Sequence, residues 1–202
     1  MRERKLAKKF NRQARMYEKQ RKNQTLKKWR QQLIRHAHGN VLELAVGAGA
    51  NFPYYQKDVQ VTGIDISPKM IEKAKEGASF YHIDANFLVG NVEKATFENE
   101  QFDTVVSTLS FCGYDDPLQM LALANQWCKP GGTILLMEHG ISRNRLLSLL
   151  QNMINPVAKW IVGCHQNRPI MNLIEQSPLK IIHHETHVQG ILQIVRAKAT
   201  ST

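Results

Sequence analysis

Cysteine is scarce in this sequence, and long hydrophobic runs are absent. The three cysteines, Cys112, Cys128 and Cys164, are widely separated, form no C-x-x-C pair and lack metal-ligand spacing, which favours a reducing compartment. No apolar run reaches the roughly 18 residues that would span a bilayer. The start at Met1–Lys5 is basic but has no apolar core of a secretory signal after it. We therefore expect a cytoplasmic protein.

Positive charge is concentrated in the first 30 residues. The net charge is +10, yet residues 1–30 hold 13 lysines and arginines against Glu3 and Glu18, and the rest of the chain is close to neutral. Apolar residues recur in this region at helical spacing. They are Leu6, Phe10, Ala14 and Tyr17, and then Leu26, Trp29 and Leu33. We predict two short amphipathic helices in a basic N-terminal arm over residues 1–38, followed by the main domain over residues 39–202.

This basic arm has three interpretations. In the first, its apolar stripe packs on the main domain while its lysines face water. In the second, residues 1–30 contact an anionic membrane, where each basic residue contributes roughly 1 kcal/mol. In the third, they bind RNA or DNA phosphates. We favour nucleic acid less, because the sequence has no nucleic-acid-binding module and no second basic patch.

The most informative segment joins two apolar strands through a loop of small residues. Val41–Leu44 runs into Ala45–Ala50, and a second apolar stretch, Val61–Ile64, ends at Asp65. Glycines in the loop let the backbone approach a ligand closely because they carry no Cβ. A carboxylate at the tip of the adjacent parallel strand can accept both hydroxyls of a ribose. The segment therefore predicts a nucleoside-binding site.

Predicted strands and helices alternate after the arm. The strands are expected at 40–46, 59–64, 86–90, 103–108, 132–138, 180–187 and 191–197. The helices are expected at 50–57, 67–76, 116–128 and 143–154, with a break at Asn155–Pro156 and a further helical stretch to about 163. Such alternation predicts a parallel sheet with helices on both faces. The expected fold class is α/β, a Rossmann-like doubly wound seven-stranded sheet, mostly parallel with an antiparallel C-terminal hairpin.

Five ordered landmarks carry a family resemblance. After the loop and Asp65 come Phe87–Glu93, Phe102–Leu109 and Lys129–His139. Together they resemble motifs I to V of the class I S-adenosylmethionine (SAM) dependent methyltransferases, of the methyltransferase type 11 or UbiE-like group. The resemblance implies SAM as methyl donor, S-adenosylhomocysteine as product, and no metal. Residues 39–202 would then be the SAM-dependent methyltransferase domain.

The resemblance also implies which residues hold the cofactor. Glu43 would orient the loop and the amino acid end of SAM, Asp65 would bind the ribose, and Ile66 and Met70 would flank the adenine. The full expected set is Glu43, Ala45, Gly47, Gly49, Asn51, Asp65, Ile66, Met70, Asn91, Val92, Glu93, Thr108 and Leu109.

Two of these positions depart from the family pattern. Asn91 stands where the family usually has an aspartate that accepts from the adenine amino group. The neutral amide keeps an acceptor but makes a weaker hydrogen bond. Ala45 replaces the first glycine of the loop, which we expect to be tolerated because the backbone there should still be strand-like.

Residues after the later strand tips are candidates for the acceptor side. His139 is the best candidate for a general base, since its unperturbed pKa is about 6.5, although it could equally be a strand-end histidine that orients a loop. Tyr114 is a second catalytic candidate. The residues expected to face the acceptor are Tyr17, Phe111, Cys112, His165 and Arg168. Cys112 is expected to be a packing residue because these enzymes transfer methyl directly. A metal at Cys164 and His165 is not expected, since adjacent ligands rarely complete a site.

The segment 143–164 has an apolar stripe at helical spacing, which includes Leu146, Leu150, Met153, Val157 and Trp160. The simpler interpretation makes it a lid packed on the sheet. The functional one makes it the lining of a pocket for a lipophilic acceptor.

Several short motifs resemble a narrower group. They are Gly49–Phe52, Thr108–Cys112, Met137–His139, Asn155–Pro156 and Gly163–Arg168. They resemble the small methyltransferase-like family that includes thiol S-methyltransferases, close to the quinone and phosphatidylethanolamine methyltransferases. We predict a SAM-dependent methyltransferase acting on a small, apolar acceptor of thiol, quinone-like or phospholipid type. The alternatives are an RNA-modifying methyltransferase recruited by the arm and a noncatalytic SAM-binding protein. The sequence leaves the oligomeric state open.

Overall fold

Seven strands form one mixed sheet in the order β3-β2-β1-β4-β5-β7-β6. The computed structural model describes residues 2–161 and 163–201. The strands are β1 (Asn40–Leu44), β2 (Gln60–Asp65), β3 (Asp84–Val89), β4 (Phe102–Thr108), β5 (Cys128–His139), β6 (Lys180–His187) and β7 (Leu192–Lys198). The first five are parallel, and β7 is antiparallel to both β5 and β6. The predicted fold class is confirmed.

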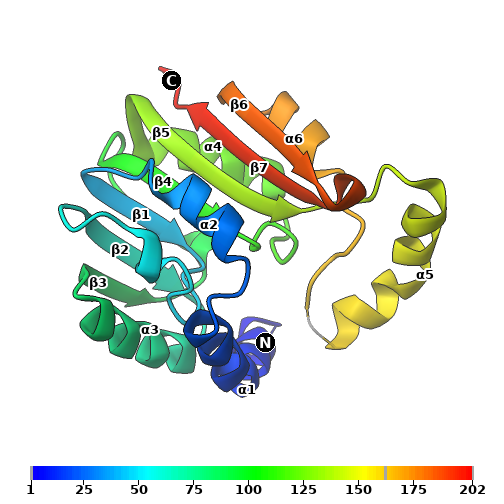
Figure 1. Ribbon diagram of the computed structural model, residues 1–202, viewed down its shortest axis with the longest axis horizontal. Helices are drawn as coiled ribbons and strands as arrows, with labels where there is room; N and C mark the ends of the chain where they lie inside the picture. The colour runs from blue at the N-terminus through cyan, green and yellow to red at the C-terminus, as the bar shows by residue number, and fades with distance from the viewer. Residues whose placement is uncertain (1, 162, 202) are drawn as a thin grey trace.

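Helices cover both faces of this sheet (Figure 1). On one face α2 (Lys27–Ile34) and α3 (Pro68–Tyr81) pack through Leu33, Ile34 and Ile71. On the other face lie α4 (Pro117–Trp127) and α6 (Ile170–Gln176), whose core residues include Trp127 and Ile174. Because helices cover both faces, the central strands β1 and β4 are buried along nearly their whole length.

Two helix starts follow the chemistry expected of their sequences. Ser67 caps α3, where its Oγ accepts a hydrogen bond from Met70 N at 3.1 Å, and Pro68 occupies the first turn. Asp116 caps α4 in the same way by accepting from Gln119 N at 2.9 Å. These side chains satisfy amide groups that have no partner inside the helix, so both boundaries were predictable from sequence.

The helix predicted at 50–57 is wrong. Only one 3₁₀ turn, Phe52–Tyr54, forms there. Gly49 has a φ of 79°, and a Cβ at this position would collide with the Phe52 ring. The chain therefore turns tightly over Gly49, and Phe52 is buried instead of continuing a helix.

The predicted break at Asn155–Pro156 is also wrong. A single helix, α5 (Arg145–Ile161), passes through this position. Proline deprives the carbonyl of residue 152 of its helical partner. Asn152 and Pro156 are both exposed, so water can hydrate that carbonyl and the helix continues. The structure likewise extends β5 back through Pro130–Gly132, where a loop was expected, with an irregular register between Phe102 and Thr104.

The N-terminal region forms the two predicted helices, α1 (Arg2–Lys22) and α2. Phe10, Ala14 and Tyr17 of α1 pack against Met70 of α3. Asn11 Oδ1 accepts hydrogen bonds from Ser67 Oγ at 2.6 Å and from the amide of residue 69 at 3.2 Å. The apolar stripe of α1 is thus in contact with the body of the protein, as the first interpretation of the arm expects.

Arg21 attaches the end of α1 to the body. Its side chain is buried, and its guanidinium donates to the carbonyl of Ala48 at 2.6 Å and to that of Lys73. The guanidinium occupies the space beside Gly77 of α3, where a Cβ would collide with it. Gly77 therefore makes room for this attachment.

We predict that Gly77→Ala destabilises the protein, although alanine is better than glycine in a helix by about 1 kcal/mol. The added Cβ would displace Arg21 and leave two carbonyls without their donor. Urea denaturation of Gly77→Ala, Arg21→Ala and the double variant measures the coupling. In the Arg21→Ala background the glycine replacement should stabilise by roughly 1 kcal/mol. Equal effects of Gly77→Ala in both backgrounds would contradict the account.

Candidate functional site

A cavity of about 370 Å³ lies at the carboxyl ends of the parallel strands. Most of the expected site residues line it. From the cofactor set these are Ala45, Gly47, Asp65, Ile66, Met70, Asn91, Val92, Glu93, Thr108 and Leu109, and from the acceptor set Tyr17, Cys112, Tyr114 and His139. The expected residues that do not line it are Glu43, Gly49, Asn51, Phe111, His165 and Arg168. Loops separated widely in sequence thus meet around one space.

The loop after β1 turns under Asp65. Gly47 has a φ of 56°, and its amide donates to Asp65 Oδ2 at 3.0 Å. Ala45 has a φ of 49°, so its predicted strand-like backbone is wrong. A left-handed residue with a Cβ is strained, and alanine at this position carries that strain where glycine would avoid it. The loop is nevertheless held in place because the amide of Val46 donates to the carbonyl of Ile64 at 3.0 Å.

Asp65 presents a buried carboxylate to the cavity. Oδ1 accepts from Ser67 N at 2.8 Å, while Oδ2 accepts from Gly47 N. Burial raises the pKa of Asp65 to about 6, although both amides lower it. A carboxylate fixed in this way has lone pairs left for the hydroxyls of a ribose. Its place suits the nucleoside end of SAM.

Glu43 lies beneath the cavity and supports the loop instead of lining the wall. It is 2 % exposed and accepts hydrogen bonds from Asn51 Nδ2 and from the hydroxyl of Tyr55, both at 2.8 Å. Burial raises the pKa of Glu43 to about 7, against the effect of these two donors. The expectation that Glu43 orients the loop agrees with these contacts, while its direct contact with SAM stays a prediction.

Arg30 of α2 brings a positive charge to the cavity wall. Its Nη1 donates to Asn51 Oδ1 at 2.6 Å and to Thr108 Oγ1 at 3.0 Å. Its Nε is buried and has no hydrogen-bond partner among the described residues. A guanidinium is the natural partner of a carboxylate. The amino acid carboxylate of SAM would fit here. Sequence reasoning missed Arg30 because it lies in the basic arm, far from every motif.

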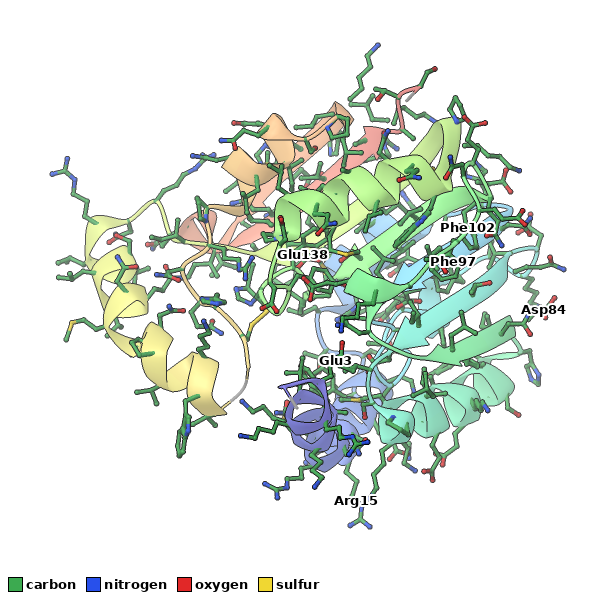
Figure 2. All side chains as sticks on the ribbon, turned by 180° about the vertical axis from the view of Figure 1, so that it is seen from behind. Glu3, Arg15, Asp84, Phe97, Phe102 and Glu138 are labelled. Atoms are coloured by element: carbon green, nitrogen blue, oxygen red, sulfur yellow. A yellow bond between two sulfur atoms is a disulfide. The ribbon has the colours of Figure 1, made fainter. Side chains whose placement is uncertain are left out.

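Glu138, which is labelled in Figure 2, holds the loop after β4. Its carboxylate accepts from Ser107 Oγ at 2.7 Å and from the amides of Ser110 and Phe111 at 2.9 and 3.1 Å. Burial raises the pKa of Glu138 to about 7. No role was predicted for this residue, although its place at a strand end beside His139 was a usable signal. Phe111, expected in the acceptor site, is buried in the core instead.

Asn91 and Glu93 sit at the end of β3. Asn91 Oδ1 accepts from Glu93 N at 3.1 Å, and its Nδ2 donates to Glu3 Oε1 of α1 at 3.0 Å. Glu93 Oε1 accepts from the amides of Asp115 and Asp116 at 2.7 and 3.0 Å. Both side chains therefore fix loops at the cavity wall. Recognition of adenine by Asn91 stays a prediction.

Cys112 and Cys164 form a disulfide across the cavity wall, which corrects two expectations. Cys112 is not an unpaired packing residue, and cysteine usage no longer argues for a reducing compartment. Widely separated cysteines give no pairing signal, since proximity across 52 residues depends on the tertiary fold. The free cysteine, Cys128, is buried. Sulfurs joined in a disulfide are not thiolate ligands, so the nearby His139 does not complete a metal site with them.

His139 faces the cavity beside this disulfide. Its Nε2 lies 3.1 Å from Cys164 Sγ, and its buried Nδ1 has no hydrogen-bond partner in the described structure. Burial lowers the pKa of His139, and the Arg168 guanidinium adds to this. The neutral imidazole is therefore the favoured form, which is the form that accepts a proton.

Tyr114 is a poor proton acceptor. Its hydroxyl donates to Ser110 Oγ at 3.1 Å, and burial raises its pKa. Arg168 donates to the carbonyl of Tyr114 from outside the cavity lining, and the backbone amide of His165 donates to the carbonyl of Cys112 at 2.9 Å. These contacts support the loop.

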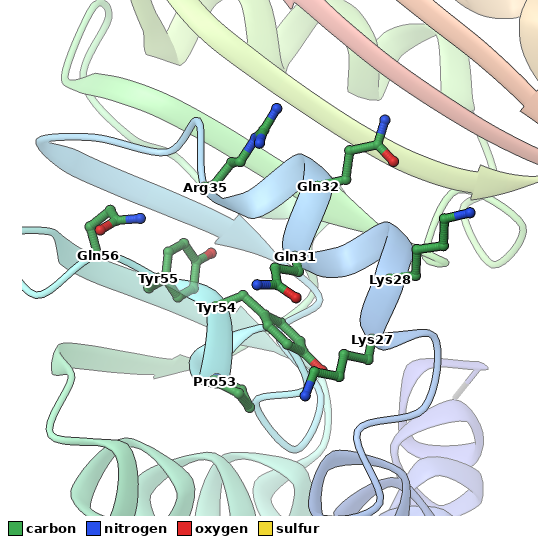
Figure 3. Close-up of a pocket in the computed structure, with 9 residues that line it drawn as sticks. All are labelled: Lys27, Lys28, Gln31, Gln32, Arg35, Pro53, Tyr54, Tyr55 and Gln56. Carbon is green, nitrogen blue, oxygen red and sulfur yellow. The ribbon is translucent and has the colours of Figure 1, made fainter.

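A second, open groove of about 940 Å³ lies beside α2 (Figure 3). Its walls come from the turn at Pro53–Gln56, from α2 and from the residue after it, namely Lys27, Lys28, Gln31, Gln32 and Arg35. The motif residues lie elsewhere, and the lining side chains are polar, basic or aromatic. The chemistry expected from sequence therefore belongs to the smaller cavity.

Comparison with known proteins agrees with this geometry. Residues 42–136 match the family described as "Methyltransferase domain". Residues 42–136 therefore form a methyltransferase domain, and the seven-stranded sheet is the fold found in solved SAM-dependent methyltransferases. The predicted resemblance is confirmed, and the residues described above provide a carboxylate, a guanidinium and apolar walls that fit SAM.

Three relatives illustrate the range of similar proteins. "Methyltransferase OMS1, mitochondrial" of Saccharomyces cerevisiae is 29 % identical over 195 residues, covering 86 % of this chain and 41 % of that protein. The phosphatidylethanolamine N-methyltransferase of Cereibacter sphaeroides is 25 % identical, covering 70 % and 74 %. Rat thiol S-methyltransferase TMT1B is 32 % identical, covering 72 % and 62 %. The chain thus spans about two fifths of the yeast protein and three fifths of the rat one.

Solved structures support the fold. The methyltransferase chain in the Haloferax volcanii complex with the Trm112 activator has a TM-score of 0.72 at 15 % identity, covering 95 % of this chain and 98 % of that one. Such a likeness at low identity shows a shared architecture. The acceptor must therefore be argued from the site itself.

We predict that Glu43→Gln reduces the pH dependence of stability. Glu43 has a pKa of about 7 in the folded protein against an ordinary value of 4.5, so the folded state holds a proton that the unfolded chain releases. The contribution of protonated Glu43 to the free energy of unfolding is full below about pH 4.5 and is lost as the pH rises through about 7. Urea denaturation across this range should show a less negative slope for the variant than for the wild type. Identical slopes would contradict the raised pKa.

We also predict that reduction of Cys112–Cys164 destabilises the fold. The disulfide closes a 52-residue separation, so its loss should lower the unfolding free energy by about 2–4 kcal/mol. Urea denaturation with and without a phosphine reductant measures this. Cys128→Ser should keep the full sensitivity, whereas the Cys112→Ser/Cys164→Ser variant should lose it. An unfolding free energy of the wild type that is the same with and without the reductant would contradict the pairing of Cys112 with Cys164.

Proposed function

We propose that the protein transfers the methyl group of SAM to a small, largely apolar acceptor of thiol, quinone-like or phospholipid type. The single observation that carries this proposal is the composition of the cavity. Beyond the cofactor loops its wall is formed by apolar groups such as Leu6, Phe10 and the Cys112–Cys164 disulfide, together with His139. An apolar wall favours an apolar acceptor because its burial removes hydrocarbon surface from water.

Bound SAM supplies a sulfonium methyl group that is already activated for transfer. The protein therefore has mainly to align the acceptor and exclude water, which accounts for much of the acceleration in reactions of this kind. Asp65 and Arg30 would fix the two ends of SAM, since they lie on the wall of the same cavity. The acceptor would then occupy the part of the cavity near His139.

His139 would take a proton from a thiol or hydroxyl acceptor. Burial favours its neutral form, and its ring reaches the cavity. A neutral imidazole within hydrogen-bond reach of the acceptor assists deprotonation at the moment of attack. Tyr114, whose hydroxyl proton is donated to Ser110 Oγ, would orient the acceptor by accepting a hydrogen bond on its phenolic oxygen. The relatives named for thiol and phosphatidylethanolamine substrates support these acceptor classes.

We predict that Asp65→Ala weakens binding of S-adenosylhomocysteine by roughly 10- to 100-fold, because a hydrogen bond to a charged group contributes about 1.5–3 kcal/mol. Isothermal titration calorimetry gives the affinity. Asp58→Ala is the matched control, since Asp58 is exposed on the connection just before β2. Equal affinities for the parent and both variants would defeat the site assignment.

Turnover with one acceptor of each class tests the proposed acceptor class and the proposed role of His139. A small alkyl thiol, a short-chain demethylated quinone and a phosphatidylethanolamine vesicle provide the panel. His139→Asn should lower turnover of the thiol at neutral pH while leaving S-adenosylhomocysteine affinity within about twofold. Methylation of tRNA alone would overturn the proposal in favour of RNA modification. Tight SAM binding without turnover of any acceptor would overturn it in favour of a noncatalytic protein.

A further inference from the structure

Helix α5 is amphipathic, but its polar side faces the protein and its apolar side faces outward, whereas an ordinary surface helix has the opposite orientation. Its polar side faces the protein, where Gln151 donates to the carbonyls of Gly140 and Gln166 at 3.0 and 2.9 Å and accepts from Ser142 N at 2.7 Å. Asn155 Oδ1 accepts from Gln166 N at 2.8 Å. Gln151 is the buried residue of this helix. Hydrogen bonds to backbone, rather than apolar packing, therefore attach α5 to the body.

The apolar side of α5 faces outward. The exposed residues follow the pattern i, i+3, i+4, i+7 along the whole helix. They are Leu146, Leu149, Leu150, Met153, Ile154, Val157, Trp160 and Ile161. Leu146 and Trp160, near the two ends, are 78 % and 79 % exposed. The expectation that this stripe packs on the sheet as a lid is wrong, because the polar contacts of Gln151 and Asn155 turn it away. Figure 1 shows α5 projecting from the sheet.

A basic surface lies next to this apolar one. Lys9 of α1 donates to the carbonyl of Trp160 at 2.7 Å, so α1 borders the C-terminal end of α5. The two helices lie side by side there in both ribbon views (Figures 1 and 2). The exposed basic residues of α1 are Arg4, Lys5, Lys8, Arg12, Arg15, Lys19 and Lys22. Figure 2 shows Arg15 pointing away from the body.

We propose that the outward face of α5 and the basic face of α1 together dock the protein on an anionic lipid bilayer. An in-plane helix inserts its apolar side into the boundary between headgroups and acyl chains, and adjacent cations bind acidic headgroups. No described helix is both long and apolar enough to cross a bilayer. A nucleic acid would match the lysines and arginines but leave the tryptophan and leucines in water.

The position of this surface connects it to the cavity. Gly163 and Cys164, directly after α5, line the cavity, and so do Leu6 and Phe10 of α1. A lipophilic acceptor dissolved in the bilayer would therefore meet the segments that border the site. This consequence rests on the proposed function, whereas the docking itself depends only on the exposed residues of α5 and α1.

Vesicle co-sedimentation of the full chain tests the proposal. Binding to phosphatidylcholine vesicles with about 30 % phosphatidylserine should exceed binding to phosphatidylcholine alone and should weaken as salt is raised. Met153→Glu/Trp160→Glu should reduce binding at least about tenfold, since two large apolar groups no longer insert. Lys8→Glu/Arg12→Glu should reduce it at least about 20-fold, as roughly fivefold is lost per basic residue.

Matched controls separate docking from general effects of charge and fold. Phe80→Glu removes an aromatic residue of α3 that is 74 % exposed, and Lys57→Glu/Lys75→Glu reverses two exposed lysines outside the surface. Both should bind vesicles like the wild type. Equal binding of all variants would overturn the proposal. It would also be overturned if vesicles were not bound while light scattering showed a dimer that Met153→Glu/Trp160→Glu converts to a monomer, because α5 would then cover a second copy. S-adenosylhomocysteine affinity, measured in parallel, reports on the proposed function separately.

Discussion

Three buried carboxylates at the ends of parallel strands determine the shape of the site. Glu43 holds the turn after β1, Asp65 holds the glycine loop and the start of α3, and Glu138 holds the loop after β4. Burying an acid is costly, and the raised pKa of all three reflects that cost. Each acid is stabilised by donors from the loop it supports. The cavity walls and the carboxylates therefore depend on each other.

Local chemistry explains what was predictable from sequence. Strand patterns, the helix start at Ser67, and the pairing of a small-residue loop with Asp65 each depend on a few neighbouring residues. Residues that act across long distances were missed. Arg30 donates hydrogen bonds to Asn51 and Thr108 from the arm, and no pattern among neighbouring residues in the sequence predicts such long-range hydrogen bonds.

The predictions for Ala45 and for the apolar stripe on α5 were wrong for the same reason: contacts with residues distant in sequence decide both. Ala45 adopts a left-handed φ because Val46 and Gly47 are bonded to β2, which overrides the preference of alanine. The stripe on α5 was correctly placed on a helix, but its direction depends on Gln151 and Asn155, which bond to loops distant from the stripe itself. Periodicity indicates that a helix has two sides, and tertiary contacts decide which side faces the protein.

The central claim is that the space above Gly47 and Asp65 holds the nucleoside of SAM. A crystal structure of the complex with S-adenosylhomocysteine tests it most directly. The account predicts ribose hydroxyls on the Asp65 carboxylate, the adenine flanked by Ile66 and Met70, and the amino acid carboxylate near Arg30. A ligand bound elsewhere, for example in the open groove beside α2, with Asp65 making no contact to the ribose, would contradict the account.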